Sequence, residues 1–89
     1  MDNKEKLNSM EKMVRQLEDL VNSETSIIRK VGQMEAENIN LNFKLLDKQL
    51  PDILSNSEKN LELATSLHDE FVKEKDAFIK ENKLEEVVN

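Results

Sequence analysis

His68 is the only histidine of the chain and the first residue to examine for chemistry, because imidazole titrates near neutral pH. A catalytic base or a metal ligand needs a second group held beside it. The acidic residues that follow, Asp69, Glu70, Glu74 and Asp76, do not share a helical face with His68 at the spacing of a metal pair. We therefore interpret His68 as a partly solvated histidine at the edge of a packed helix face, and the acidic run as solvated surface.

Other arrangements that enzymes use are missing from the sequence. A single Gly excludes a Gly-rich phosphate loop, and the lack of Cys excludes a thiolate nucleophile, a thiolate metal site and a disulfide. No set of Ser, His and acidic residues has an evident pocket to work in. We expect a protein that is not an enzyme, with no cofactor, no metal and no small-molecule substrate.

The charge balance argues against nucleic acid as a partner. Nineteen acidic and 13 basic residues give a net charge of −6, which repels phosphate, and no Lys or Arg stripe is interleaved with aromatic residues. No apolar run is long enough for a signal peptide or a membrane span. We expect a cytoplasmic protein without membrane insertion, although export that reads a folded helix pair would leave no such signal.

The composition predicts an all-α fold in a single domain. Charged residues make up 36% of the 89 residues and apolar residues 37%, with one Gly, one Pro, no Trp and no Tyr, which is typical of long helices. The apolar residues recur at helical spacing, which argues against disorder. A chain of this size often needs a partner or a second copy to complete its core.

The first predicted helix covers about residues 4–47. Its apolar seam, with a flanking line spaced seven residues apart, favours contact with more than one neighbouring helix. The polar run at residues 22–26 is the one place where the helix could break, and a three-helix bundle with a turn near residue 23 is the alternative. The seam comprises Leu7, Met10, Val14, Leu17, Val21, Ile28 and Val31; the flanking line comprises Met13, Leu20, Ile27, Met34 and Leu41.

Pro51 predicts a short joint at about residues 48–51, because proline restricts the residue before it and suits the first turn of a helix. A second helix should then cover about residues 52–83, followed by a frayed C-terminal tail. A capping-box sequence at residues 55–58 offers a later start. Because short joints connect antiparallel neighbours, we expect a coiled-coil-like helical hairpin.

A turn near residue 50 predicts that residues facing each other have numbers adding to about 99, so that Val21 lies opposite Phe78. Polar residues that interrupt the two seams then coincide, and a polar pair inside a seam can fix register at a cost in stability. The predicted register-setting pairs are Glu24 with Lys75 and Asn42 with Ser57.

A second apolar line on the first helix is predicted to face away from the second helix and to bind a partner. It consists of Gly32, Ala36, Ile39, Phe43, Leu46 and Leu50. The alternatives are that the second helix, or an N-terminal segment that folds back, covers this row. Gly32 is either tolerated in mid-helix or lets another helix approach closely.

These features predict a non-enzymatic protein-interaction module, a structural or adaptor subunit that joins a helical bundle or coiled coil with other chains or its own copies. A small secreted or inhibitory binding protein is the alternative. The hairpin outline resembles the small helical-hairpin proteins of type VII secretion. Those proteins place Trp-x-Gly at the joint, whereas residues 47–51 read Asp-Lys-Gln-Leu-Pro, so the resemblance covers the outline alone.

Overall fold

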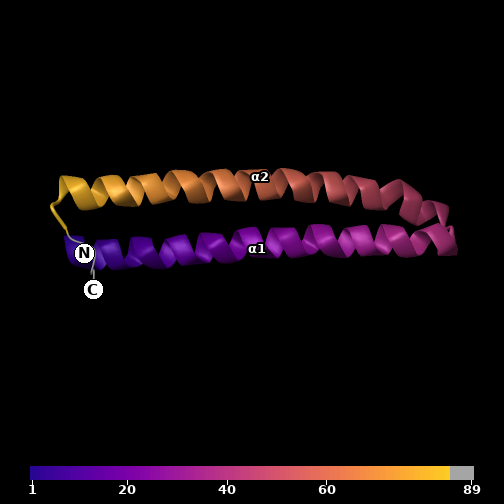
Figure 1. Cartoon of the computed structure of the whole chain (residues 1–89), viewed down its shortest axis with the longest axis horizontal. Coiled ribbons are helices and arrows are strands. Elements are labelled where there is room, and N and C mark those ends of the chain that lie inside the picture. Colours follow the sequence, from indigo (N-terminus) through magenta and orange to yellow (C-terminus); the bar gives the residue numbers. More distant parts are fainter. Residues whose placement is uncertain (85–89) are drawn as a thin grey trace.

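The computed structural model describes residues 1–84 and consists of two long helices joined by two residues. Helix α1 spans Asn3–Leu41 and helix α2 spans Lys44–Glu81. They run antiparallel and lie side by side along their whole length (Figure 1). The predicted all-α hairpin is therefore confirmed. Because α1 continues through residues 22–26, the three-helix alternative is wrong.

The start of α1 is fixed by a capping box. The Asp2 carboxylate accepts a hydrogen bond of 2.8 Å from the Glu5 N–H, and the Glu5 carboxylate accepts one of 3.2 Å from the Asp2 N–H. This exchange satisfies two backbone donors at the helix start and places negative charge at the positive end of the helix dipole. The predicted start near residue 4 agrees with this cap.

The joint lies at Asn42 and Phe43, so the predicted joint at residues 48–51 and the bounds that followed from it are wrong. Asn42 ends α1 in the left-handed conformation with φ of 60°, and its N–H donates to the Asn38 carbonyl at 2.6 Å. Asparagine is the residue after glycine that most often takes this position. Phe43 is extended and begins α2 without a side-chain cap of its own.

Pro51 lies inside α2, about two turns from its start. Proline in a helix interior removes one hydrogen bond and costs about 3 kcal/mol. Figure 1 shows α2 bending toward α1 close to the joint, in the segment that contains this proline. The capping-box sequence at residues 55–58 is also internal to α2. The proline therefore bends a helix that the asparagine at the joint has already started.

Four contacts between the helices show the register. Asn3 hydrogen-bonds Asn82 at 3.0 Å, the Lys6 Nζ lies 5.1 Å from the Phe78 ring centroid, and the Asn38 amide donates to the Asp47 carboxylate at 2.8 Å. His68 faces Glu18 with 3.6 Å between Nε2 and Oε2. Facing residues thus have numbers adding to about 85, and the predicted sum of 99 is wrong by two heptads.

The core is a single seam between the helices. Along each helix the inward positions alternate by three and four residues, as in a heptad coiled coil. The buried apolar side chains are Leu7, Leu17, Val31, Leu50 and Ala64, and two polar residues, Asn38 and Ser57, are buried among them. No large side chain among the described residues is fully buried. The expected frayed tail falls largely on residues 85–89, outside the described range.

Candidate protein-interaction surface

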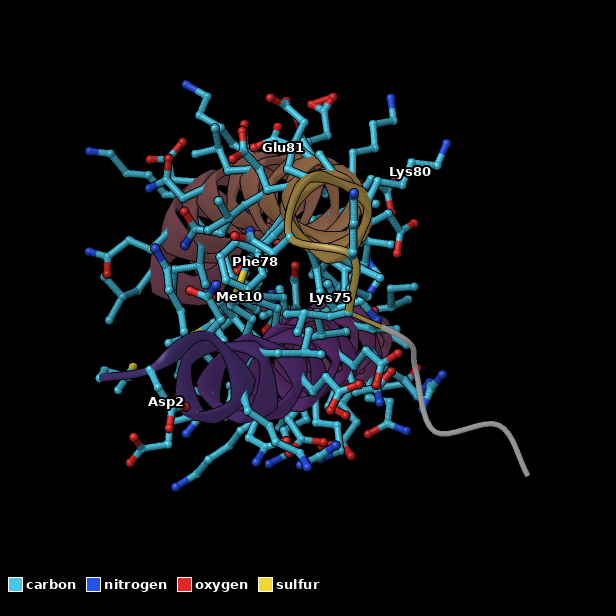
Figure 2. The ribbon with its side chains drawn as sticks, turned by 90° about the vertical axis from the view of Figure 1, so that its left-hand side faces the viewer. Asp2, Met10, Lys75, Phe78, Lys80 and Glu81 are labelled. Carbon is cyan, nitrogen blue, oxygen red and sulfur yellow. The ribbon has the colours of Figure 1, made fainter. Side chains whose placement is uncertain are left out.

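The predicted register-setting pairs do not meet. The observed register places Glu24 at the level of Leu61, and Lys75 at the level of Met10. Figure 2, which looks along the hairpin from its open end, shows Met10, Lys75 and Phe78 pointing into the space between the helices. Both predicted pairs are therefore wrong.

Asn42 and Ser57 serve different structural roles instead. Asn42 caps α1 at the joint, and Ser57 is buried in the seam at the level of Ile28. Neither lies opposite the other, because the whole register is shifted by two heptads. The polar contact that does join the helices near the joint is that of Asn38 with Asp47.

Asn38 holds the joint together. Its side chain is 2% exposed and makes three hydrogen bonds: its Oδ1 accepts from the Phe43 N–H at 3.0 Å, and its Nδ2 donates to the Phe43 carbonyl at 3.1 Å and to the Asp47 carboxylate at 2.8 Å. It thereby pairs the backbone N–H and carbonyl of Phe43 and ties the end of α1 to the first turn of α2 through Asp47. The sequence reasoning missed this residue. The signal for it was the spacing of Asn38, Asn40 and Asn42, since asparagine favours helix ends.

The predicted partner-binding row is not one continuous face. Because α1 ends at Leu41, the last members of the row belong to α2, where Leu46 is half-buried and Leu50 is 4% exposed in the seam. The prediction that Leu50 faces outward is therefore wrong. Gly32, Ala36, Ile39 and Phe43 are exposed, and their part in binding stays a prediction.

Gly32 makes no close approach within the hairpin. A Cβ built on this residue meets nothing within 4 Å. The glycine is therefore not required by the packing of α1 against α2. The close approach of a helix from a partner chain at Gly32 stays a prediction.

A different apolar surface follows one side of the hairpin, and we call it the apolar strip. Its α1 members stand one position before successive seam residues, and Leu20 shares a shallow groove with Leu63 and Leu67 of α2. The side chains of the strip are 42 to 63% exposed. The strip comprises Met13, Leu20, Ile27, Met34 and Leu41 of α1 and Ile53, Leu63 and Leu67 of α2.

The side of the hairpin that carries the strip is poor in charge. Helical geometry places 18 residues there, from Met13 to Leu41 on α1 and from Leu46 to Glu74 on α2. The charged ones are Lys30, Glu37, Glu70 and Glu74, and Glu24 of the seam also lines the groove at Leu20. The same stretch of the opposite side carries Glu11, Arg15, Glu18, Arg29, Lys48, Glu58, Glu62, Asp69 and Asp76. The strip is thus a local departure from a surface that is otherwise densely charged.

His68 lies on the charged side of the seam, at the level of Leu17. Its side chain is 21% exposed; Nδ1 is 3.1 Å from the Asp69 carboxylate, and the buried Nε2 has no hydrogen-bond partner within residues 1–84. The 3.6 Å to Glu18 is longer than a hydrogen bond. The interpretation of His68 as an edge residue agrees with this position. In the part of the chain that the structure describes, no group of three or more His, Cys, Asp or Glu side chains could hold a metal ion.

Comparison with known proteins finds no match, whether to a protein-family model, to a curated protein or to a solved structure. Neither α1 nor α2 has a stretch apolar enough to span a membrane. The apolar strip is a feature of the described residues that the packing of α1 against α2 leaves unexplained.

Proposed function

We propose that this chain is a non-enzymatic protein-interaction module, a structural or adaptor subunit that completes a helical bundle by burying its apolar strip against the helices of another protein chain. The observation that carries the proposal is the continuity of the strip, which follows α1 from Met13 to Leu41 and extends onto α2. Single exposed apolar residues are common on proteins, whereas contiguous apolar patches of several hundred Å² mark interaction sites.

The free energy available from burying the strip is large on the scale of a small domain. Full burial of one Leu, Ile or Met side chain contributes about 1.5–3 kcal/mol, so covering the exposed half of eight such side chains contributes roughly 6–12 kcal/mol before association costs. A typical domain is stable by about 5–15 kcal/mol in total. Before association costs, burial of the strip is therefore of the same order as the net stability of a typical small domain.

The shape of the strip fits helices as its partner. The members of the strip on α1 are spaced seven residues apart, which is the repeat by which one helix packs along another. The groove at Leu20 and Leu63 lies between α1 and α2. An amphipathic helix laid along such a groove would bury residues of both α1 and α2. A pair of helices would cover the strip across its full width.

Photo-crosslinking tests the proposal. A benzoylphenylalanine introduced at Leu63, in the organism that encodes the chain, should form protein adducts in the cell. Leu45 is the matched control, because it is also a leucine of α2, is equally exposed at 63%, and points away from α1. Adducts at Leu63 and none at Leu45 would support docking through the strip. The absence of adducts at Leu63, or the same adducts at both positions, would refute it.

A further inference from the structure

We infer that the chain that covers the apolar strip is a second copy of this one, so that two hairpins stack face to face in a two-fold symmetric four-helix bundle. This inference rests on the proposed function and adds the identity of the partner. It is carried by the area of the strip, by the distribution of charge around it and by the symmetry of its own residues.

The area of the strip matches what a stable dimer needs. Eight large side chains that are each about half exposed present on the order of 800 Å², which is the area that each partner buries in a standard protein interface. The apolar members continue over four heptads, from Met13 to Leu41. Two such strips are long enough to cover each other without a third chain.

The charge distribution makes this side the one on which two copies can meet. Each copy carries a net charge of −6, so most of its surface repels a second copy. The strip side has four charged residues. The opposite side is more acidic: five of its heptads each carry at least one acidic residue, among them Glu18, Glu58 and Asp69. Burying the opposite side would desolvate those carboxylates, at a cost of several kcal/mol for each one left unpaired.

The members of the strip other than Leu63 are also arranged symmetrically about its middle. Met13 and Leu41 are equally distant from Ile27, and the register places Asn60 of α2 beside Ile27. Consider a two-fold axis that runs perpendicular to both helices at this level, in the plane between the two copies. It stacks α1 on the partner's α1 and α2 on the partner's α2, and each stacked pair is antiparallel. Leu67 then lies against the partner's Ile53, and Leu20 against the partner's Met34.

In this arrangement no charge of the strip side meets a like charge. Glu70 lies opposite the partner's Gln49, and Glu74 lies opposite the partner's Leu46. Asn60 meets the partner's Asn60 on the axis, where one amide can donate to the other, as a polar pair that fixes the register of an otherwise apolar interface. An axis parallel to the helices would instead stack each α2 on the partner's α1 and bring the acidic last thirds of both α2 helices to the same end of the bundle. The crossing axis separates these two acidic segments to opposite ends.

The mass of the purified chain, measured by sedimentation equilibrium, gives the first test. Micromolar protein should have twice the monomer mass of 10.3 kDa. Leu67→Glu should lower it to the monomer mass, and Leu45→Glu, the same substitution at an exposed leucine off the strip, should leave the dimer intact. A wild-type chain that is fully helical and monomeric at every concentration would overturn the inference.

Mixing two variants tests the contact itself. Leu67→Glu and Ile53→Lys should each be monomeric alone, and an equimolar mixture should restore the dimer, because one copy's new carboxylate then faces the other copy's new ammonium. A mixture that stays monomeric, while the wild type is dimeric, would refute the crossing axis. Because the chain has no Cys, a nitroxide on Asn60→Cys gives an independent reading that does not depend on these variants. It should show one distance between copies of roughly 10 Å, the separation of packed helices, and a distance several times longer would also refute the arrangement.

Failure of this inference is distinguishable from failure of the proposed function. If the wild type is monomeric and the probe at Leu63 yields an adduct with a different protein, the strip binds another chain and the proposed function stands. If the probe at Leu63 yields no adduct and the chain is monomeric, both are refuted. An adduct at Leu63 with twice the mass of the chain supports both.

Discussion

The side chain of Asn38 should contribute more to the stability of the hairpin than any other polar group near the joint. Truncation by Asn38→Ala removes three hydrogen bonds: two to the backbone of Phe43 and one to the Asp47 carboxylate. A neutral hydrogen bond contributes about 0.5–1.5 kcal/mol and one to a charged group about 1.5–3 kcal/mol. Since Phe43 and Asp47 are exposed and water can replace part of what they lose, we expect a net destabilisation of about 2–3 kcal/mol.

The assay is urea unfolding followed by circular dichroism at a fixed protein concentration, since association would otherwise change the midpoint. Asn40→Ala is the matched control, because Asn40 is an exposed asparagine in the same turn of α1 as Asn38. Alanine is the better helix former at this position. We expect the control to be neutral or slightly stabilising. Asp47→Asn should cost less than Asn38→Ala, and the double variant should be less destabilised than the sum of both single variants. If Asn38→Ala and Asn40→Ala unfold within about 0.5 kcal/mol of each other, Asn38 does not clamp the joint.

Gly32→Ala should stabilise the hairpin by about 1 kcal/mol in urea unfolding, because the added Cβ meets open space and alanine favours the helix; a loss of stability would reveal a close neighbour at this residue. His68→Leu should stabilise by roughly 1 kcal/mol in the same assay, because an apolar side chain replaces a buried Nε2 without a hydrogen-bond partner, and a destabilised variant would show that the imidazole has a structural bond. Spin labels at Val21 and Ala64 should lie roughly 10 Å apart, and labels at Val21 and Phe78 about 20 Å or more apart; the reverse order would restore the register with a sum of 99.

The heptad pattern was enough to predict the architecture and the seam positions of α1, but it could not determine the pairing. A shift of one helix along the other by 14 residues equals two heptads, so the same side chains still face the seam. The alignment of Glu24 with Lys75 was therefore a coincidence among several registers that bury the same residues. What separates these registers is the position of the joint, and the joint is a local feature of a few residues.

The predicted joint at residues 48–51 is wrong because it rests on Pro51, whereas α1 already ends at Asn42. Proline in a helix costs about 3 kcal/mol, and this argues for a boundary. Against it stands the combined stabilisation from the left-handed cap at Asn42 and the three hydrogen bonds of Asn38, which start α2 well before the proline. One of the hydrogen bonds of Asn38 goes to Asp47, which is nine residues further along the chain. A reading of local propensities does not include such a contact.

The composition of the seam explains why the flanking line of α1 is apolar at all. A seam that held a large apolar residue at every inward position would stabilise two helices along one line of contact. Here that line is interrupted by polar or small residues in both helices, Glu24 in α1 and Ser57 and Ala64 in α2, and the middle of the hairpin buries little apolar surface. The apolar strip passes these same levels, where Leu20, Ile27 and Leu63 stand beside the weakest part of the seam. A helix packed on the strip, as we propose, would add apolar contacts at the levels where the seam of the hairpin itself supplies the fewest.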